Sequence, residues 1–237
     1  MLRLEPPPGS ETDRVLVFLP GFMQAAASYG TLLEPLTAQG IRVVVPQLYR
    51  RGPSALLGRA TVEQEALDAA ALVRGEAGGR AGRSVFVGGH SRGGQAAWRA
   101  ANLLAGVDGL PAGVVLVDPV DGAGRTPTVP TATAVAASFT CPALVVGAGI
   151  EGRCAPEPVN HRHFAAATPG ARHVVVTRLG HGDILDDRPR ATARRLCTGA
   201  EDPDPGRAAV TALLTAFVLG EDQVPAACSD LLDWLRP

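Results

Sequence analysis

The sequence predicts an α/β fold in which helices cover both faces of a mostly parallel sheet. Apolar, β-branched runs over residues 14–20, 41–46 and 113–118 alternate along the chain with segments of helical periodicity. These runs are almost continuously apolar, which is typical of parallel strands that are buried on both sides. Because crossover connections are right-handed, the alternation predicts a doubly wound topology.

The elements expected before the central motif are a strand over residues 14–20, a helix over 28–39, a strand over 41–46 and a helix from 61 to about 77. Pro20 and Gly21 end the first strand in a turn, and Gly40 stops the first helix. Thr61 and Gln64 have the form of a capping box, so the longer helix is expected to begin there.

The second half continues the same alternation. After the apolar strand that begins at residue 84 and ends in the Gly-x-Ser-x-Gly turn, and the helix that follows it, the expected elements are strands over 113–118, 142–147 and 172–177, and helices over 158–167, 207–219 and 226–234. Residues 122–140 are rich in Thr, Pro and Ala without clear periodicity, which predicts a loop or a short lid. No internal repeat or linker indicates a second domain, so we predict one domain over residues 1–237.

Composition narrows the class of protein. The chain has 237 residues and is 46% apolar, which is enough for one domain with a large buried sheet. The formal net charge is -1, so nothing favours nucleic acid or an anionic membrane as a partner, and the absence of Lys excludes lysine-based chemistry such as a Schiff base. The N-terminal sequence has no apolar leader and no apolar run reaches membrane-spanning length, and we therefore expect a cytoplasmic protein.

Four cysteines, Cys141, Cys154, Cys197 and Cys228, are widely separated and show no metal-site spacing. In a chain without a leader, buried free thiols are the favoured interpretation. A disulfide between Cys154 and Cys197 is the alternative.

The central motif is Gly89-His90-Ser91-Arg92-Gly93, a Gly-x-Ser-x-Gly pattern between an apolar strand and a helix. A serine on such a sharp turn holds its hydroxyl above the sheet, and the flanking glycines allow close backbone approach. The following helix directs its free N–H groups and positive dipole end at the same place, where an oxyanion would form. Ser91 is therefore the candidate nucleophile of an α/β-hydrolase fold.

A serine hydroxyl needs a base, and in this fold the chain order is serine, acid, histidine. His181 follows the last long strand in a glycine-flanked loop that can reach back over the sheet. His90 adjoins the nucleophile on the wrong side of the turn, and His173 lies inside a predicted strand. The remaining two, His161 and His163, open a helix. We therefore predict His181 as the base.

Three acidic residues are candidates for the group that orients the histidine. Asp118 ends the strand that follows the nucleophile helix, and Asp121 lies three residues further in the same turn. Glu151 follows the next strand, which is the more usual place of the acid in this fold. A carboxylate is needed because it fixes the histidine tautomer and stabilises the imidazolium. Spacing alone gives Asp118 only a modest lead over Glu151.

The oxyanion hole needs two backbone N–H donors. The Arg92 N–H, directly after the nucleophile, is one. The other comes from the turn after the first long strand, which reads Pro20-Gly21-Phe22-Met23. Proline has no N–H, so the Phe22 N–H is the second predicted donor.

A longer set of segments is more specific than the central motif alone. In chain order it comprises Phe18-Leu19-Pro20-Gly21-Phe22, Val45-Pro46-Gln47-Leu48-Tyr49, Gly89-His90-Ser91-Arg92-Gly93-Gly94, Asp118-Pro119-Val120-Asp121-Gly122, Cys154-Ala155-Pro156-Glu157, Val159-Asn160-His161 and Gly180-His181-Gly182-Asp183-Ile184-Leu185-Asp186-Asp187. Together, over about residues 15–220, these segments resemble the plant chlorophyllase family of α/β-hydrolases.

The resemblance implies a catalytic triad. The family's serine, the first Asp of its Asp-Pro-Val segment and the His of its last segment correspond to Ser91, Asp118 and His181. The acid left open by spacing is thereby assigned to Asp118. One departure is visible, since the family commonly has His-Gly at the oxyanion turn where this chain has Pro20-Gly21.

The family hydrolyses the ester that joins a long isoprenoid alcohol to the chlorophyll macrocycle. Such a substrate needs an apolar groove, for which Met23, Tyr49, Leu56 and Phe139 are candidate lining residues. The resemblance implies a serine carboxylic-ester hydrolase that acts on a small-molecule ester and needs no metal or organic cofactor. The alternative is a general short-chain or polyester-active esterase without chlorophyll activity. Peptidases, acyltransferases and inactive binding modules share the scaffold, and the filled triad positions argue against an inactive module.

Overall fold

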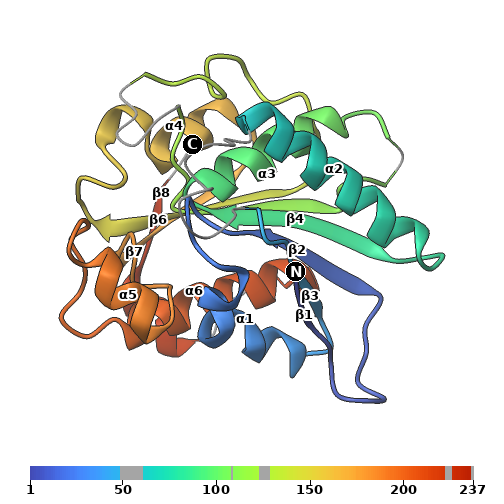
Figure 1. Ribbon diagram of the computed structural model, residues 1–237, viewed down its shortest axis with the longest axis horizontal. Helices are drawn as coiled ribbons and strands as arrows, with labels where there is room; N and C mark the ends of the chain where they lie inside the picture. Colours follow the sequence, from blue (N-terminus) through green and yellow to red (C-terminus); the bar gives the residue numbers. More distant parts are fainter. Residues whose placement is uncertain (49–60, 108, 123–128, 222–225, 236–237) are drawn as a thin grey trace.

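The computed structural model describes residues 1–48, 61–107, 109–122, 129–221 and 226–235. Figure 1 shows a central sheet between two layers of helices. One layer contains α2 (Val62–Gly78), α3 (Arg92–Leu103) and α4 (His161–Ala167), and the other contains α1 (Gly30–Thr37), α5 (Asp187–Ala193) and α6 (Asp204–Leu219). The predicted α/β architecture with helices on both faces is confirmed.

Within the described residues, eight strands form one sheet in the order β1-β3-β2-β4-β5-β6-β7-β8. They are β1 (Leu2–Leu4), β2 (Arg14–Leu19), β3 (Arg42–Val45), β4 (Ser84–His90), β5 (Gly113–Val117), β6 (Ala143–Ile150), β7 (Arg172–Gly180) and β8 (Leu232–Leu235). Neighbours from β3 to β7 pair in parallel, whereas β1 and β8 are antiparallel at the two edges. The doubly wound prediction holds for the strands between these edges.

Side chains that alternate along the central strands fill two cores. Leu16 and Phe18 of β2 belong to the core under α1 and α6, together with the fully buried Tyr29. Val17 of the same strand belongs to the core under α2 and α3, together with Trp98. Both faces of the sheet are therefore buried, which explains why the strand sequences are apolar without interruption.

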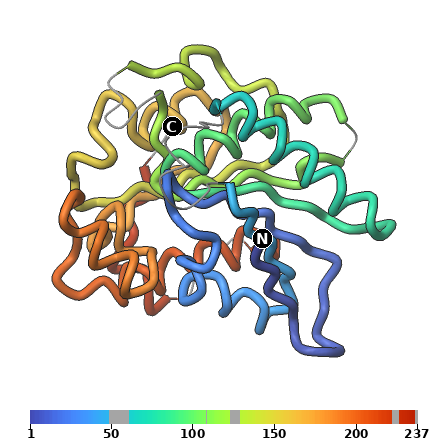
Figure 2. The backbone as a smooth tube through the Cα atoms, in the orientation of Figure 1, coloured from blue at the N-terminus to red at the C-terminus, as the bar shows by residue number. Residues whose placement is uncertain are grey.

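Chain segments from the two ends share one layer. Figure 2 shows the early helix α1 beside the late helix α6 on the same face of the sheet. The Thr211 hydroxyl of α6 donates a hydrogen bond of 3.0 Å to the Leu32 carbonyl of α1, which ties the two together. In the other layer, the Thr61 hydroxyl accepts from the Gln64 N–H at 3.1 Å, so the predicted start of α2 is confirmed.

The C-terminal prediction is wrong. In place of a helix over 226–234, Ala226–Leu231 (η4) form a 3-10 helix and Leu232–Leu235 form the edge strand β8. The Arg172 guanidinium of β7 lies 5.0 Å from the centroid of the Trp234 ring, which adds a contact across this pair of strands. Strand β1 and helix α5 were not predicted either, because β1 has three residues and α5 buries none of its residues.

The cysteine prediction is also wrong for one pair. Cys154 and Cys197 form a disulfide, with Cα atoms 5.4 Å apart, that joins the segment after β6 to the segment after α5. Cys141 and Cys228 are free, as expected. Sequence spacing could not show this pairing, because 43 positions separate two segments that only the fold brings together.

No helix in the described part of the chain has the length and apolar character needed to cross a membrane.

The ends of three parallel strands lead directly to the predicted site residues. Ser91 follows β4, Asp118 follows β5 and His181 follows β7. All three therefore lie at the carboxyl edge of the sheet, where α/β proteins bind their ligands.

Candidate active site

Ser91 occupies a strained turn between β4 and α3. Its φ of 55° and ψ of -125° lie in a region that L residues rarely adopt. Two glycines make this turn sterically feasible. A Cβ on Gly89 would lie 2.5 Å from the Gly93 carbonyl oxygen, and a Cβ on Gly93 would lie 2.2 Å from the Leu19 carbonyl oxygen. The Gly-x-Ser-x-Gly pattern is thus explained by backbone packing against the end of β2.

The structure brings the three predicted triad residues into a hydrogen-bonded series. His181 Nε2 lies 3.0 Å from Ser91 Oγ, and His181 Nδ1 lies 2.7 Å from Asp118 Oδ2. A carboxylate can only accept, so Nδ1 carries the proton and donates it to Asp118. Nε2 is then the acceptor that faces the serine hydroxyl. This tautomer is the one that a general base for Ser91 requires.

Asp118 is held as a buried carboxylate. Only 3% of the residue is exposed, and its second oxygen accepts the Ala148 N–H at 3.1 Å. Burial acts to raise the pKa of Asp118, but the hydrogen bond and charge of His181, with smaller effects of His161 and the Ala148 N–H, outweigh it and leave the pKa below its ordinary value. Asp118 is therefore ionised at neutral pH beside His181.

The other two candidate acids differ from Asp118 in burial or in partners, although Glu151 lines the same pocket as Asp118 and His181. Glu151 is exposed beyond the end of β6. Asp121 is fully buried, and its carboxylate accepts hydrogen bonds from Gln95 Nε2, Thr131 Oγ1, Thr133 Oγ1 and the N–H groups of Gly122, Ala132 and Thr133. Asp121 therefore anchors the segment that starts at residue 129 to α3.

This anchoring changes the interpretation of the predicted lid. The described part of that segment, residues 129–139, is tied down at Asp121 and again at Asn102, which accepts from the Ser138 N–H and hydroxyl. Phe139 is buried in the core, with its ring centroid 6.3 Å from that of Trp98. Phe139 is thus packed in the core, and its role in lining a substrate groove stays a prediction.

The remaining predicted groove residues differ in their positions. Met23 is 60% exposed beside the oxyanion turn, with a positive φ of 59°. Phe22 next to it is 36% exposed. Tyr49 and Leu56 lie outside the described residues.

The two predicted oxyanion segments contact each other through their side chains. The Arg92 guanidinium carbon lies 5.4 Å from the centroid of the Phe22 ring. Glu65 of α2, only 1% exposed, holds that guanidinium through two hydrogen bonds of 2.9 and 3.0 Å. The turn that contains Phe22 is therefore supported from α2 and α3, on the same side as Ser91.

The other histidines make different contacts. His161 Nδ1 and His173 Nε2 share a buried hydrogen bond of 2.8 Å. His163 is half-buried at the start of α4. His90 is 3% exposed and contacts Tyr29 and the backbone of His181.

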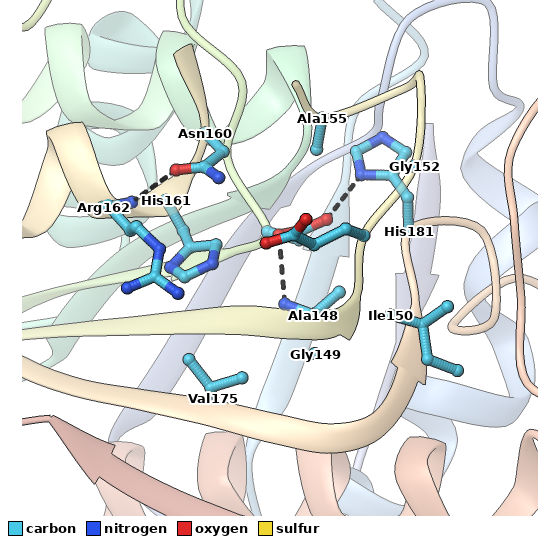
Figure 3. Close-up of a pocket in the computed structure, with 12 residues that line it drawn as sticks. Ala148, Gly149, Ile150, Gly152, Ala155, Asn160, His161, Arg162, Val175 and His181 are labelled. Carbon is cyan, nitrogen blue, oxygen red and sulfur yellow. Dashed lines mark hydrogen bonds and ion pairs between the residues drawn. The ribbon is translucent and has the colours of Figure 1, made fainter. Parts of the chain in front are cut away.

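A pocket opens beside Asp118 and His181, between the end of β6 and the start of α4 (Figure 3). Asn160 lies at its wall and caps α4, because its Oδ1 accepts the Arg162 N–H at 3.0 Å. Among the described residues, no group of three or more His, Cys, Asp and Glu side chains gathers in a way that could hold a metal ion.

Three residues of this site were not predicted as part of it. Tyr29 lies 61 positions from His90 and Glu65 lies 27 positions from Arg92, so no local pattern marks these two contacts. From sequence alone, His90 enters only as a rejected candidate for the base. Its place beside the nucleophile was the available signal that it could contact the site in another way.

Comparisons with known proteins show the family and the fold of this chain. Residues 3–231 match the model of the family described as Chlorophyllase. Chlorophyllase-1, chloroplastic, of Citrus sinensis is 34% identical over 233 residues, which is 90% of this chain and 69% of that protein. Chlorophyllase-2 of Arabidopsis thaliana is 29% identical, over 86% of this chain and 72% of that protein.

Among solved structures, a ferulic acid esterase from Streptomyces cinnamoneus matches 98% of this chain and 75% of its own, with a TM-score of 0.64 and 19% identity. At that identity the likeness concerns the fold, which is that of the α/β-hydrolases. The family match over nearly the whole chain goes further and indicates a carboxylic-ester hydrolase. The chain belongs to the chlorophyllase family.

Proposed function

We propose that this carboxylic-ester hydrolase uses Ser91 as nucleophile, His181 as base and Asp118 as the acid that orients His181. The observation that supports the proposal most strongly is the hydrogen-bonded series from Asp118 through His181 to Ser91, with contacts of 2.7 and 3.0 Å. Both distances are within the range that proton transfer and tautomer control require.

In the proposed reaction, Ser91 Oγ attacks the ester carbonyl carbon while His181 Nε2 accepts the hydroxyl proton. The carbonyl oxygen becomes an oxyanion, which the N–H groups of Phe22 and Arg92 stabilise at the head of α3. The C–O bond to the alcohol then breaks, and His181 returns its proton to the departing alkoxide. An acyl-enzyme on Ser91 remains.

Deacylation repeats the sequence with water. The pocket beside His181 (Figure 3) gives water an approach to the base. His181 removes a proton from this water, the hydroxide attacks the acyl carbon, and the Ser91 alkoxide takes the proton back as the free acid leaves. Asp118 stays ionised in both halves of the cycle and stabilises the imidazolium.

The substrate that we propose is an ester with an apolar alcohol or acyl part, of the type that the chlorophyllase family cleaves. Phe22 and Met23 support this, because they expose apolar side chains immediately beside the predicted oxyanion site. Exposed apolar groups next to a reacting centre are typical of a surface that binds apolar ligand.

A substrate panel tests the proposal. We expect turnover of both p-nitrophenyl butyrate and chlorophyll a, with phytol and chlorophyllide as the products in the second case. A polyester film completes the panel. Cleavage of butyrate or polyester with no turnover of chlorophyll would replace the proposal with a general esterase that keeps the same triad.

A further inference from the structure

A buried hydrogen-bonded path leads from the oxyanion turn to the backbone of His181. The Gly21 N–H donates to the Tyr29 hydroxyl at 2.8 Å, and that hydroxyl lies 3.0 Å from His90 Nδ1. His90 Nε2 lies 2.9 Å from the His181 carbonyl oxygen. Three parts of the chain that are distant in sequence, namely residues 21–29, His90 and His181, are thus joined by three hydrogen bonds.

The direction of each bond follows from its partners. The His181 carbonyl can only accept, so His90 Nε2 carries a proton and donates it. A neutral His90 then has a lone pair at Nδ1, and the Tyr29 hydroxyl must donate to it. The oxygen of Tyr29 is left with a lone pair that accepts the Gly21 N–H. Every donor on the path therefore has its own acceptor.

The surroundings keep His90 and Tyr29 neutral. Tyr29 is fully buried and His90 is 3% exposed. Burial raises the pKa of Tyr29. Burial, reinforced by the charge of His181, lowers the pKa of His90 to about 3. A histidine in this state accepts no proton at neutral pH, so it holds a position and does not act as a base.

Packing makes the path sensitive to small displacements. A Cβ on Gly21 would lie 3.0 Å from His90 Nδ1 and 3.3 Å from Ser91 Cβ, so the oxyanion turn rests directly on β4 and the nucleophile. The His90 and His181 ring centroids are 4.7 Å apart. A shift of His90 would therefore move both the turn that precedes Phe22 and the loop that carries His181.

We propose that Tyr29 and His90 are positioning residues for ester hydrolysis, which hold the Gly21–Phe22 turn and the His181 loop at a fixed separation on either side of Ser91. This inference rests on the proposed function, since it assigns a role relative to the Ser91 nucleophile and the Phe22 oxyanion donor. Misplacement of such groups by a fraction of an ångström lowers turnover far more than it weakens substrate binding.

The first variant is Tyr29→Phe, which removes one oxygen and keeps the ring in its packing. With p-nitrophenyl butyrate, and with active sites counted by fluorophosphonate labelling of Ser91, we expect kcat to fall about 10- to 100-fold and KM to change less than twofold. Inhibition by an alkyl trifluoromethyl ketone, which forms an oxyanion in the site, should weaken by about the same factor as kcat/KM.

Two further variants divide the path at His90. In His90→Gln, the side-chain amide can take the place of Nε2 and still donate to the His181 carbonyl, but the acceptor for Tyr29 is lost. In His90→Asn, the side-chain amide can take the place of Nδ1 and still accept from Tyr29, but the donor to His181 is lost. Each should lose less activity than His90→Phe, which removes both contacts. Because Tyr29→Phe and His90→Gln break the same link, the double variant should be little worse than the poorer single variant.

Trp98→Phe is the matched control. It also removes a buried hydrogen bond, of 2.9 Å from Trp98 Nε1 to Thr168 Oγ1, but in the core away from Ser91. We expect it to lower the melting temperature and leave kcat per labelled site within twofold. A purely structural role for Tyr29 would make Tyr29→Phe behave in the same way.

The outcomes separate this inference from the proposed function. If Ser91→Ala keeps esterase activity, the proposed function fails. If Ser91→Ala is inactive but Tyr29→Phe retains kcat and ketone inhibition within twofold of the wild type, the proposed function stands and the positioning role is overturned. Should His90→Phe not fold, Tyr29→Phe and the two amide variants still decide the question.

Discussion

Backbone strain marks the proposed site at the scale of single residues. Among the described residues, the non-glycine residues with positive φ are Met23, Ser91 and Asp118. All three lie on segments that the proposed mechanism uses: the oxyanion turn, the nucleophile turn and the acid. Such conformations cost of order 1–3 kcal/mol each and persist where the surrounding structure enforces them. Here the glycines at 89 and 93 and the hydrogen bonds of Asp118 provide that enforcement.

The acid is tested by a pair of variants. Asp118→Asn should lower kcat by about 10⁴-fold, because the amide no longer selects the His181 tautomer that serves Ser91. Glu151→Gln, which changes an exposed residue, is the control and should lower it less than about threefold. Measurement of p-nitrophenyl butyrate hydrolysis at pH 7.5 decides between them. A large loss in Glu151→Gln with activity kept in Asp118→Asn would transfer the role to Glu151.

Sequence reasoning reached the parts of this site that are local in the chain. Ser91 could be predicted because its turn requires a strand, glycines and a helix within about ten positions, and His181 because glycines flank it after a long strand. Spacing could not separate Asp118 from Glu151, since both follow neighbouring parallel strands and only the fold determines which side chain reaches His181. Tyr29 and Glu65 were missed for the same reason.

At the scale of elements, the parallel strands and their helices follow from hydrophobic pattern, and the exceptions are informative. Residues 226–234 contain apolar residues that fit a helix, yet pairing with the exposed edge of β7 fixes Leu232–Leu235 as a strand. The predicted lid over 122–140 has no periodicity because its described part is held by side-chain hydrogen bonds to Asp121 and Asn102. Tertiary contacts therefore determine the conformation of both segments.

The disulfide links two connecting segments beside the site. Closure of the loop between Cys154 and Cys197, 43 positions apart, stabilises the folded chain by about 4 kcal/mol on the chain-entropy model. The double variant Cys154→Ser/Cys197→Ser should lose a comparable free energy of unfolding in urea, and Cys141→Ser, at a free cysteine, should change it by less than about 1 kcal/mol.

Equal stability of the double variant and the wild type would show that the two thiols do not pair in solution. Protein disulfides are typical of oxidising compartments, whereas the cytoplasmic location is expected because the sequence shows no apolar leader and no apolar run of membrane-spanning length. That location stays a prediction.

At the scale of the whole molecule, buried histidines make stability depend on pH. Burial lowers the pKa of His90 to about 3 and, together with the neighbouring charges of His161 and Arg162, that of His173 to about 4. Both values are below the unfolded value of about 6.5, so the unfolded chain binds protons that the folded chain refuses. The stabilisation is therefore full above pH 6.5 and declines as the pH falls toward 4.

The free energy of unfolding should thus drop between pH 7 and pH 5, by up to about 2 kcal/mol each for His90 and His173, and His161, whose pKa burial also lowers, adds to the drop. Urea unfolding at several pH values measures this. His173→Gln removes one titrating group. It should reduce the slope of the free energy of unfolding against pH by the equivalent of about one bound proton. A slope that is flat from pH 7 to pH 5 would contradict the predicted neutral state of these side chains. The pKa values of Asp118 and Asp121 are lower than the ordinary value of an aspartate. These two carboxylates therefore change the free energy of unfolding only at pH values below this range.

The central claim is that Ser91 carries the reaction, and one measurement tests it most directly. Wild-type protein and Ser91→Ala are each incubated with a fluorophosphonate probe, assayed with p-nitrophenyl butyrate and mapped by peptide mass spectrometry. The wild type should hydrolyse the ester and carry the probe on Ser91. Ser91→Ala, with an unchanged melting temperature, should do neither. Ester turnover that persists in Ser91→Ala, or a probe adduct on a different residue of the wild type, would contradict the claim.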